Sequence, residues 1–299
     1  MDDSSIHKHF VDSSVVQPIL LGSSAYRKYF ENQFADENVY ISDYVQMEIK
    51  RSCIIPFVDF YFLLDMPNIE SIGDALAVWS NRFSGREIKA VTRLVGALFD
   101  THQLSDLNPK DKAKALRRLG YLIKRIEGQL RRRFINVGIN TTRCARSHVS
   151  FDSIETDQSL VVDQLEQFAK RFNDIDNCRA KCRIDNFFLN RFKRDVEAFF
   201  EQVENLDRPK SRENKGFVDI TEKLRRIIKT GGNACSCRMC GSIGDAVIAL
   251  EMPGNMQLEH TDFSFDNLCQ VTGKAHKRHP SEIEFLKNYN TAVSSSKEN

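Results

Sequence analysis

Short apolar stretches followed by capped helices recur at both ends of this chain, and this alternation restricts its fold more than any other feature. Near the N-terminus, the segment HFVDSS has an apolar, β-prone stretch that meets Asp12, and two serines then favour the start of a helix. Residues 39–41 are expected to form a second buried strand, after which Ser42 or Asp43 caps a helix that carries Glu48. Strands that alternate with helices in this way predict a parallel α/β sheet.

The C-terminal part returns to the same alternation. The segment IGDAVIALEM fits a helix, MQLEHTD fits a strand with Asp262 at its carboxyl end, and FDNLCQVTG fits another helix. Upstream of them, residues 217–220 (FVDI) are strand-like, and TEKLRRIIKT is a capped amphipathic helix. A fifth strand is only weakly indicated, in KAHKRHPSEIEFL.

The middle of the chain follows a different pattern. From residue 57 to residue 215, apolar residues recur at helical spacing, with a short extended piece around residues 134–139. Residues 205–216 (NLDRPKSRENKG) are polar and contain Pro and Gly, which predicts a linker. The predicted organisation is a discontinuous α/β core at 1–56 and 216–280, a helical insertion at 57–215, and a C-terminal tail at 281–299.

Composition limits the class of protein. With 299 residues, of which 41% are hydrophobic and 28% charged, the chain is typical of a globular protein. Its apolar runs are shorter than the ~18 residues of a membrane span, and MDDSSIHKHF lacks the basic-then-apolar order of a secretory signal. We therefore expect a cytoplasmic protein with no membrane contact, whose eight cysteines are reduced.

Four acidic residues share one topological property. Asp12 and Asp262 follow strands, whereas Glu48 and Asp245 lie near the starts of helices. In an open α/β sheet such positions meet at the carboxyl edge, where ligands bind. Carboxylates gathered there repel one another unless divalent cations neutralise them, and oxygen ligands suit Mg²⁺ or Mn²⁺. This chemistry fits phosphodiester hydrolysis by a metal-activated water, without a serine or histidine nucleophile.

The motifs around these acids resemble one known family. VDSS after an apolar strand, ISDYVQMEI, GDAVIAL and EHTDFSF together resemble the PIN domain, a family of metal-dependent nucleases that includes many ribonucleases. The resemblance implies a three-layer α/β/α domain with a central, mostly parallel sheet, and it gives Thr261 a part in shaping the site. It assigns metal binding and catalysis to four residues, Asp12, Glu48, Asp245 and Asp262.

The activity that this resemblance implies is that of a divalent-metal-dependent endonuclease acting on single-stranded nucleic acid, RNA more than DNA. The roles of this family in microbes further imply a partner protein, either an inhibitory antitoxin or a component of a defence system. Two alternatives stay open: a catalytically inactive, zinc-stabilised PIN-like nucleic-acid-binding or scaffold protein, and a phosphatase-like hydrolase on the same acidic edge. PIN domains are usually compact, so the long insertion either adds specificity or covers the site. Asp266 is either an auxiliary acid or a helix cap.

The cysteines form two tight clusters. Cys237 and Cys240 have the spacing of a zinc knuckle, and Cys178 and Cys182 lie one helical turn apart. The favoured arrangement joins these four thiolates around a structural Zn²⁺, with Cys235 as a substitute ligand; the alternative is a set of scattered reduced thiols. The remaining cysteines are expected to be core or surface residues, namely Cys53, Cys144 and Cys269.

A basic segment lies within the predicted insertion. Ten lysines and arginines, against two acids, occur from Lys110 to Arg133. An apolar stripe would let this helix pack while its cations attract phosphate backbones. The stripe consists of Leu116, Leu119, Leu122 and Ile126. The alternative is a merely solvated helix face. The candidate nucleic-acid contacts are Lys110, Lys114, Arg117, Arg118, Lys124, Arg125, Arg131 and Arg132.

Overall fold

The structure is a computed structural model of the chain. Within its 299 residues it describes the following parts: 8–35, 37–82, 85–100, 109–137, 144–151, 158–174, 176, 178, 182, 184, 190–229 and 240–295. The chain folds into two compact units. Unit 1 comprises Met1–Gln46, Phe134–Ala145 and Ile175–Asn299, and unit 2 comprises Met47–Arg133 and Arg146–Asp174.

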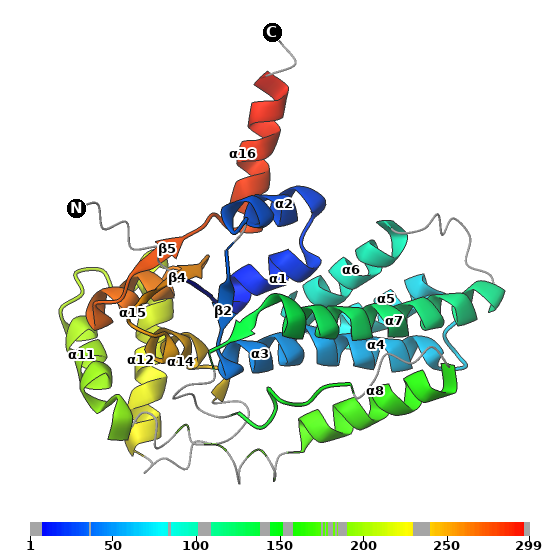
Figure 1. The fold of residues 1–299 in the computed structure, drawn as a ribbon, viewed down its shortest axis with the longest axis horizontal. Helices are drawn as coiled ribbons and strands as arrows, with labels where there is room; N and C mark the ends of the chain where they lie inside the picture. The colour runs from blue at the N-terminus through cyan, green and yellow to red at the C-terminus, as the bar shows by residue number, and fades with distance from the viewer. Residues whose placement is uncertain are drawn as a thin grey trace. The chain divides into compact units, whose positions relative to one another are not determined.

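The core of unit 1 is a sheet of five parallel strands in the order β3, β2, β1, β4, β5 (Figure 1). At its centre, His9 of β1 pairs with Val39 on one side and with Gln257 on the other. The predicted parallel α/β sheet is confirmed, and the direction in which the chain adds strands reverses between β1 and β4. The strands are β1 (Lys8–Val11), β2 (Val39–Ile41), β3 (Ile135–Asn136), β4 (Met256–His260) and β5 (His276–Arg278).

Helices of unit 1 cover both faces of this sheet. Successive side chains of a strand point to opposite faces. Glu259 of β4 reaches His279, which lies against Phe30 of α2, whereas the neighbouring His260 lies beside Phe265 of α15. Among the described residues, the helices that lie wholly in unit 1 are α1 (Ser13–Leu21), α2 (Ser24–Gln33), α11 (Lys193–Glu204), α12 (Arg212–Lys229), α14 (Gly244–Glu251), α15 (Ser264–Thr272) and α16 (Glu282–Ser295).

Unit 2 is helical, as the apolar spacing predicts. Its central helix, α4, contacts α5, α6, α7 and α8, and Phe60 of α4 meets the ring of Trp79 edge-on at 5.7 Å. The helix α3 (Asp43–Ile49) begins in unit 1, and its last residues belong to unit 2. The other elements are the π-helix η1 (Lys50–Ile54), α4 (Ile55–Asp65), α5 (Ile72–Arg82), α6 (Gly85–Asp100), α7 (Pro109–Arg133) and α8 (Gln158–Asn173).

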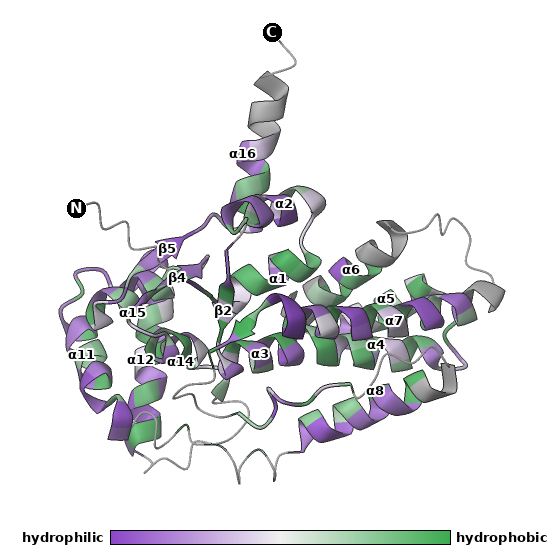
Figure 2. Ribbon diagram, in the orientation of Figure 1, coloured by the Kyte–Doolittle hydropathy of each residue, from purple (hydrophilic) through white to green (hydrophobic). Residues whose placement is uncertain are grey.

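Hydropathy differs sharply between the helices (Figure 2). The helices α1 and α14 are hydrophobic along most of their length, and most of their residues are buried. By contrast, α7, α8 and α12 carry hydrophilic and hydrophobic residues side by side, which is typical of helices with one face in solvent. In the described part of the chain, no helix has both the length and the hydropathy that crossing a membrane requires.

A buried ion pair holds three segments of unit 2 together. The Nζ atom of Lys50, on η1, lies 3.5 Å from a carboxylate oxygen of Glu127 on α7, and both side chains are 1% exposed. The same ammonium donates to the backbone carbonyls of Ser147 and Val149, at 2.6 and 2.7 Å. Burial raises the pKa of Glu127, an effect that Lys50 and Arg131 oppose. The charge of Lys50 is therefore fully coordinated inside the unit.

A second buried carboxylate lies on β4. Glu259 accepts hydrogen bonds from Nδ1 of His9, at 2.7 Å, and from Nε2 of His279, at 2.6 Å. Burial on its own would raise the pKa of Glu259, but the two histidines outweigh it and lower that pKa. The hydrogen bond to Glu259 in turn raises the pKa of His9. Glu259 thus joins β1 to the segment that follows β5.

The structure differs from the predicted domain organisation in several places. The extended piece predicted at 134–139 exists, but it is β3 and belongs to the sheet of unit 1. The helix α11 also belongs to unit 1, so the separate helical unit is smaller than the predicted insertion. Residues 217–220 were predicted as a strand, and this is wrong, because they form part of α12 with Phe217 and Ile220 buried. Within the predicted C-terminal tail at 281–299, residues 282–295 form α16, which packs on α2 through Phe285 and Tyr26.

Candidate active site at the carboxyl edge of the sheet

Asp12 lies directly after β1 and caps the first turn of α1. Its carboxylate accepts hydrogen bonds from the backbone N–H groups of Ser13 and Ser14, at 2.5 and 2.9 Å, and from the Ser13 hydroxyl at 3.1 Å. The local sequence dictates this arrangement, since aspartate is among the preferred N-cap residues. Asp12 is 1% exposed, so a negative charge on it is almost completely removed from water.

Two further aspartates of the predicted set act on Asp12. Asp262 is exposed and follows β4, the neighbour of β1, while Asp245 lies in the first turn of α14 and accepts a hydrogen bond from the Ser264 hydroxyl at 2.5 Å. Burial raises the pKa of Asp12 from 3.8 to about 7, and the charges of Asp262 and Asp245 add to that rise. Three of the four predicted acids therefore lie close enough for the charges of Asp262 and Asp245 to raise the pKa of Asp12.

The position of these aspartates follows from the topology of the sheet. The order of the strands reverses between β1 and β4, and clefts outside the carboxyl ends of strands at such a point are the usual ligand sites of open α/β sheets. The loop after β4 is tied to the start of α1, because the backbone N–H of Thr261 donates to the Ser14 hydroxyl at 3.0 Å. This bond holds the segment of Asp262 beside the cap formed by Asp12.

Glu48, the fourth predicted acid, is placed differently. It lies on α3 beyond the boundary between the two units, which passes between Gln46 and Met47, and it pairs with Arg51 at 3.5 Å. Its part in a common site with the aspartates of unit 1 stays a prediction.

Two polar residues at the same edge were missed as site residues. Asp43, considered only as a helix cap, follows β2 and is buried, and the side-chain amide of Asn136, the last residue of β3, donates to it. Polar residues thus follow or end four adjacent strands. The sequence signal was an acid close behind an apolar strand, the same signal that identified Asp12.

Another group of ligand-bearing side chains lies on the α15 face of the sheet. Among the described residues, the group whose candidate ligand atoms all lie within 4.8 Å of one another is His260, Asp266 and His276; the three aspartates of the edge do not meet that criterion. Burial, followed by repulsion from His276, lowers the pKa of His260 to about 3, so its imidazole is neutral. Phe263 occupies the N-cap position of α15, and Asp266 lies in the first turn of that helix, where it pairs with Arg278 at 3.2 Å. The two histidines were missed because no local motif connects them.

The predicted cysteine site falls partly outside the described residues, since Cys235 and Cys237 are not among them. Cys178 and Cys182 lie one helical turn apart as expected, with the N–H of Cys182 donating to the carbonyl of Cys178 at 2.9 Å. The sulfur atoms of the three described candidates, Cys178, Cys182 and Cys240, do not form a group within 4.8 Å of one another. A shared zinc site therefore stays a prediction. Two other cysteines, Cys53 and Cys269, are fully buried.

The basic segment forms the long helix α7. Of the predicted apolar stripe, Leu116, Leu119 and Ile126 are buried, and Leu122 is half-buried. The exposed cations of the predicted set are Lys114, Arg117, Arg125, Arg131 and Arg132, and Arg118 is half-buried. The prediction is wrong for Lys124, which is buried and donates to Gln164 at 2.5 Å. The side chain of Lys110 lies outside the described residues.

One exposed face of α7 combines cations with an aromatic ring. Lys114, Arg118, Tyr121, Arg125 and Arg132 are separated by whole helical turns, so they lie along the same side of the helix. Tyr121 is 56% exposed in the middle of this row. We call these five residues the α7 stripe. Single-stranded nucleic acids bind to such a combination, because their bases stack on aromatic rings and their phosphates contact cations.

Comparison of the chain with family models, with curated proteins and with solved structures gives no match. The resemblance to PIN domains therefore stays a prediction from the four motifs.

Proposed function

We propose that this chain is a divalent-metal-dependent endonuclease that hydrolyses phosphodiester bonds in single-stranded nucleic acid, with RNA preferred. The observation that carries the proposal is the buried carboxyl of Asp12, whose pKa rises to about 7 through burial and through the charges of Asp262 and Asp245. A cation among these three groups would relieve their repulsion. The preference for RNA rests on the resemblance of the motifs to the PIN domain.

The donor set fits a hard divalent ion. Carboxylate oxygens are the ligands that Mg²⁺ and Mn²⁺ prefer, and Asp12, Asp245 and Asp262 would hold the ion, with Glu48 added by the resemblance. Bound Mg²⁺ or Mn²⁺ supplies Lewis-acid activation of water and neutralises charge on the phosphate. The protein's own contribution is orientation: the first turn of α1 fixes Asp12, and the Ser264 hydroxyl fixes Asp245.

Cleavage of labelled single-stranded RNA and DNA by the full chain in Mn²⁺, with and without a chelator, tests this function. We expect endonucleolytic products from RNA that disappear with the chelator. Asp245→Asn should lower the rate by about 100-fold or more, because it removes one charged ligand while keeping an acceptor for Ser264. The matched control is Asp219→Asn, which changes an exposed aspartate on α12 and should leave the rate unchanged.

Each other outcome points to a different function. RNA binding without any metal-dependent cleavage by the wild-type chain would overturn the nuclease and favour the non-catalytic scaffold. Hydrolysis of nucleoside monophosphates with intact polymer would favour a phosphatase-like enzyme. Equal cleavage by Asp245→Asn and the wild type would remove the aspartates from the mechanism.

The α7 stripe is the proposed contact for the nucleic-acid strand. Tyr121→Ala should weaken binding of single-stranded RNA about tenfold, because stacking of one base on an aromatic ring contributes about 1–3 kcal/mol. The double change Arg118→Gln with Arg125→Gln should reduce the dependence of log K on log salt, by up to about one per lost phosphate contact. Fluorescence anisotropy at several salt concentrations measures both effects.

Lys170→Gln is the matched control for loss of charge, because Lys170 is exposed on α8 of the same unit and lies outside the stripe. If Lys170→Gln weakens binding as much as the stripe variants, the contact is general electrostatic attraction and the stripe has no special part in it.

A further inference from the structure

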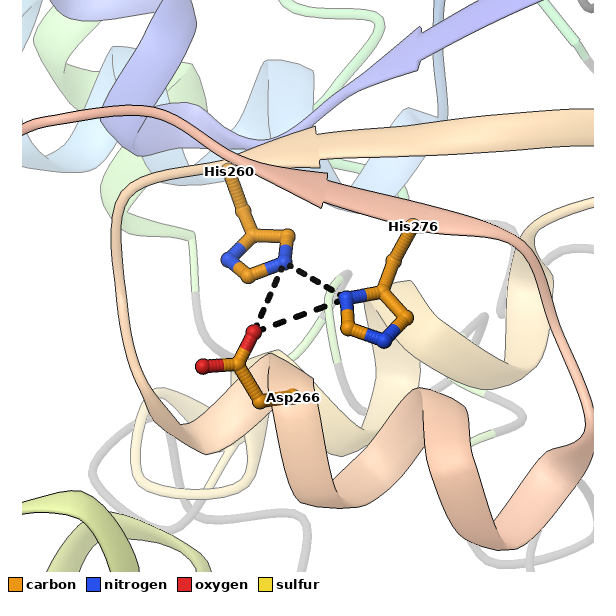
Figure 3. A group of neighbouring side chains, drawn as sticks. All are labelled: His260, Asp266 and His276. Atoms are coloured by element: carbon orange, nitrogen blue, oxygen red, sulfur yellow. Dashed lines mark hydrogen bonds and ion pairs between the residues drawn. The ribbon is translucent and has the colours of Figure 1, made fainter.

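Three side chains from separate elements point toward one another on the α15 face of the sheet (Figure 3). His260 ends β4, His276 begins β5, and Asp266 lies in the first turn of α15. Nε2 of His260 lies 3.3 Å from Nδ1 of His276 and 3.6 Å from Oδ1 of Asp266, and that oxygen lies 3.5 Å from Nδ1 of His276. The three atoms form a nearly equilateral triangle.

The size of this triangle matches one face of a tetrahedral metal site. Zinc binds imidazole nitrogen and carboxylate oxygen at about 2.0–2.2 Å, so neighbouring ligand atoms around a tetrahedral ion are about 3.3–3.5 Å apart. The separations of 3.3, 3.5 and 3.6 Å are close to those values. An ion could therefore enter with little movement of the three side chains.

Neighbouring groups orient the ligand atoms. Nδ1 of His260 lies 2.9 Å from the backbone carbonyl oxygen of Asp262, so Nδ1 carries the proton and Nε2 presents a lone pair to the triangle. On the carboxylate, Arg278 pairs with Oδ2 of Asp266 at 3.2 Å and leaves Oδ1 for the triangle. The guanidinium of Arg278 is itself held 4.0 Å from the centre of the Phe263 ring. Metal-binding sites characteristically have such a second layer of hydrogen bonds.

The group is open to solvent on one side. The His260 side chain is fully buried, whereas those of His276 and Asp266 are 30% and 35% exposed. An ion would thus have a path from water, and a water or substrate atom could occupy its fourth position. Two imidazoles with one carboxylate suit a borderline transition ion, unlike the oxygen-only set at the carboxyl edge.

We propose that His260, Asp266 and His276 form a binding site for Zn²⁺, distinct from the Mg²⁺ or Mn²⁺ site of the proposed nuclease. The ion would join β4, β5 and α15 and fix the loop that starts at His260. Asp262 belongs to that loop, and its backbone carbonyl orients a ligand of this site while its side chain acts on Asp12. The zinc site would therefore help to hold one aspartate of the carboxyl edge in place.

The test uses the chelator-stripped full chain, with Zn²⁺ titrated by calorimetry and Co²⁺ followed by its absorption spectrum. The His276→Ala and Asp266→Asn proteins should each lose one bound Zn²⁺ per chain, or bind it at least about 10- to 100-fold more weakly. Histidine and carboxylate ligands give only visible d–d bands with Co²⁺, while thiolates add intense near-ultraviolet charge transfer. The band lost in His276→Ala should have no thiolate component.

Two controls make the outcome decisive. His148→Gln alters an exposed histidine of unit 2 and should bind Zn²⁺ as the wild type does. Asp12→Asn should also keep the zinc site, whether or not the chain proves to be a nuclease. Equal Zn²⁺ stoichiometry and affinity in wild type and His276→Ala would overturn the proposal, and so would a lost signal with thiolate charge transfer.

Discussion

Asp12→Asn is expected to stabilise the metal-free fold and, at the same time, to abolish metal-dependent cleavage. A pKa raised from 3.8 to about 7 means that the ionised carboxyl destabilises the folded state by about 4 kcal/mol at a pH above 7. Asparagine removes that charge and still caps a helix well, although its amide cannot accept both backbone N–H groups. We therefore expect a net gain of about 2 kcal/mol at about pH 8 in chelator.

The stability difference between the wild type and Asp12→Asn should depend on pH. The raised pKa of Asp12 means that its favourable contribution is complete below pH 3.8 and is lost as the pH rises to about 7. Lowering the pH from about 7 to about 5 should thus restore about 2–3 kcal/mol to the wild type alone, and the advantage of asparagine should vanish. Urea unfolding at both pH values measures the difference.

A second experiment compares the melting temperatures of the two proteins with added metal. Mn²⁺ should raise the melting temperature of the wild type, because the ion binds the folded carboxylates, and should leave that of Asp12→Asn unchanged. Cleavage should fall by about 100-fold or more in the variant. A variant that is less stable than the wild type at high pH would show that the three aspartates do not repel one another as described. Equal stabilisation of both proteins by Mn²⁺ would show that Asp12 does not hold the ion.

Glu127→Gln is expected to destabilise unit 2 by about 3 kcal/mol, because it leaves the ammonium of Lys50 buried without its counter-ion. The raised pKa of Glu127 shows that burial already disfavours its charge, so the ion pair is retained at an energetic cost. Removing one partner of such a pair nevertheless lowers the free energy of unfolding, because the other charge stays buried without a counter-ion. Thermal or urea unfolding with probes in each unit measures the effect, and the loss should be confined to unit 2.

The double variant Lys50→Met with Glu127→Leu separates charge from packing. It removes both charges and should recover part of the loss, although the carbonyls of Ser147 and Val149 then lack their donor. A double variant that is less stable than Glu127→Gln would mean that those two hydrogen bonds matter more than the ion pair. Arg131→Gln is a mild control, since that side chain is 47% exposed and contacts Glu127 from the surface.

Local sequence signals predicted the central elements of the sheet well. The strand at Val39–Ile41 and the start of a helix at Ser13 follow from apolar runs next to capping residues, and the structure confirms both. The helix that begins at Gly244 and the strand that begins at Met256 were found in the same way. Each of these elements has its own run of apolar residues, so its pattern can be recognised without knowing which other elements pack against it.

Elements that depend on distant partners were missed or misassigned. The strand β5 has the sequence His-Lys-Arg and no apolar pattern; Asp266 pairs with Arg278 at its end, and Glu259 holds the next residue, His279. FVDI was mistaken for a strand because its apolar residues are β-prone, although Phe217 and Ile220 continue at helical spacing to Leu224. The site shows the same limit: single acids were found, but the group of His260 and His276 depends on the pairing of two strands.

The outer strands of the sheet have a consequence for self-association. Among the described residues, the two border strands are very short, with two residues in β3 and three in β5, and the residues of β5 are all basic or imidazole. Long flat borders are what recruit a second chain into a shared sheet or a fibril, and brevity and positive charge discourage it. Copies of this protein that meet in solution should therefore join through helical surfaces, and concentrated samples should resist amyloid-type aggregation.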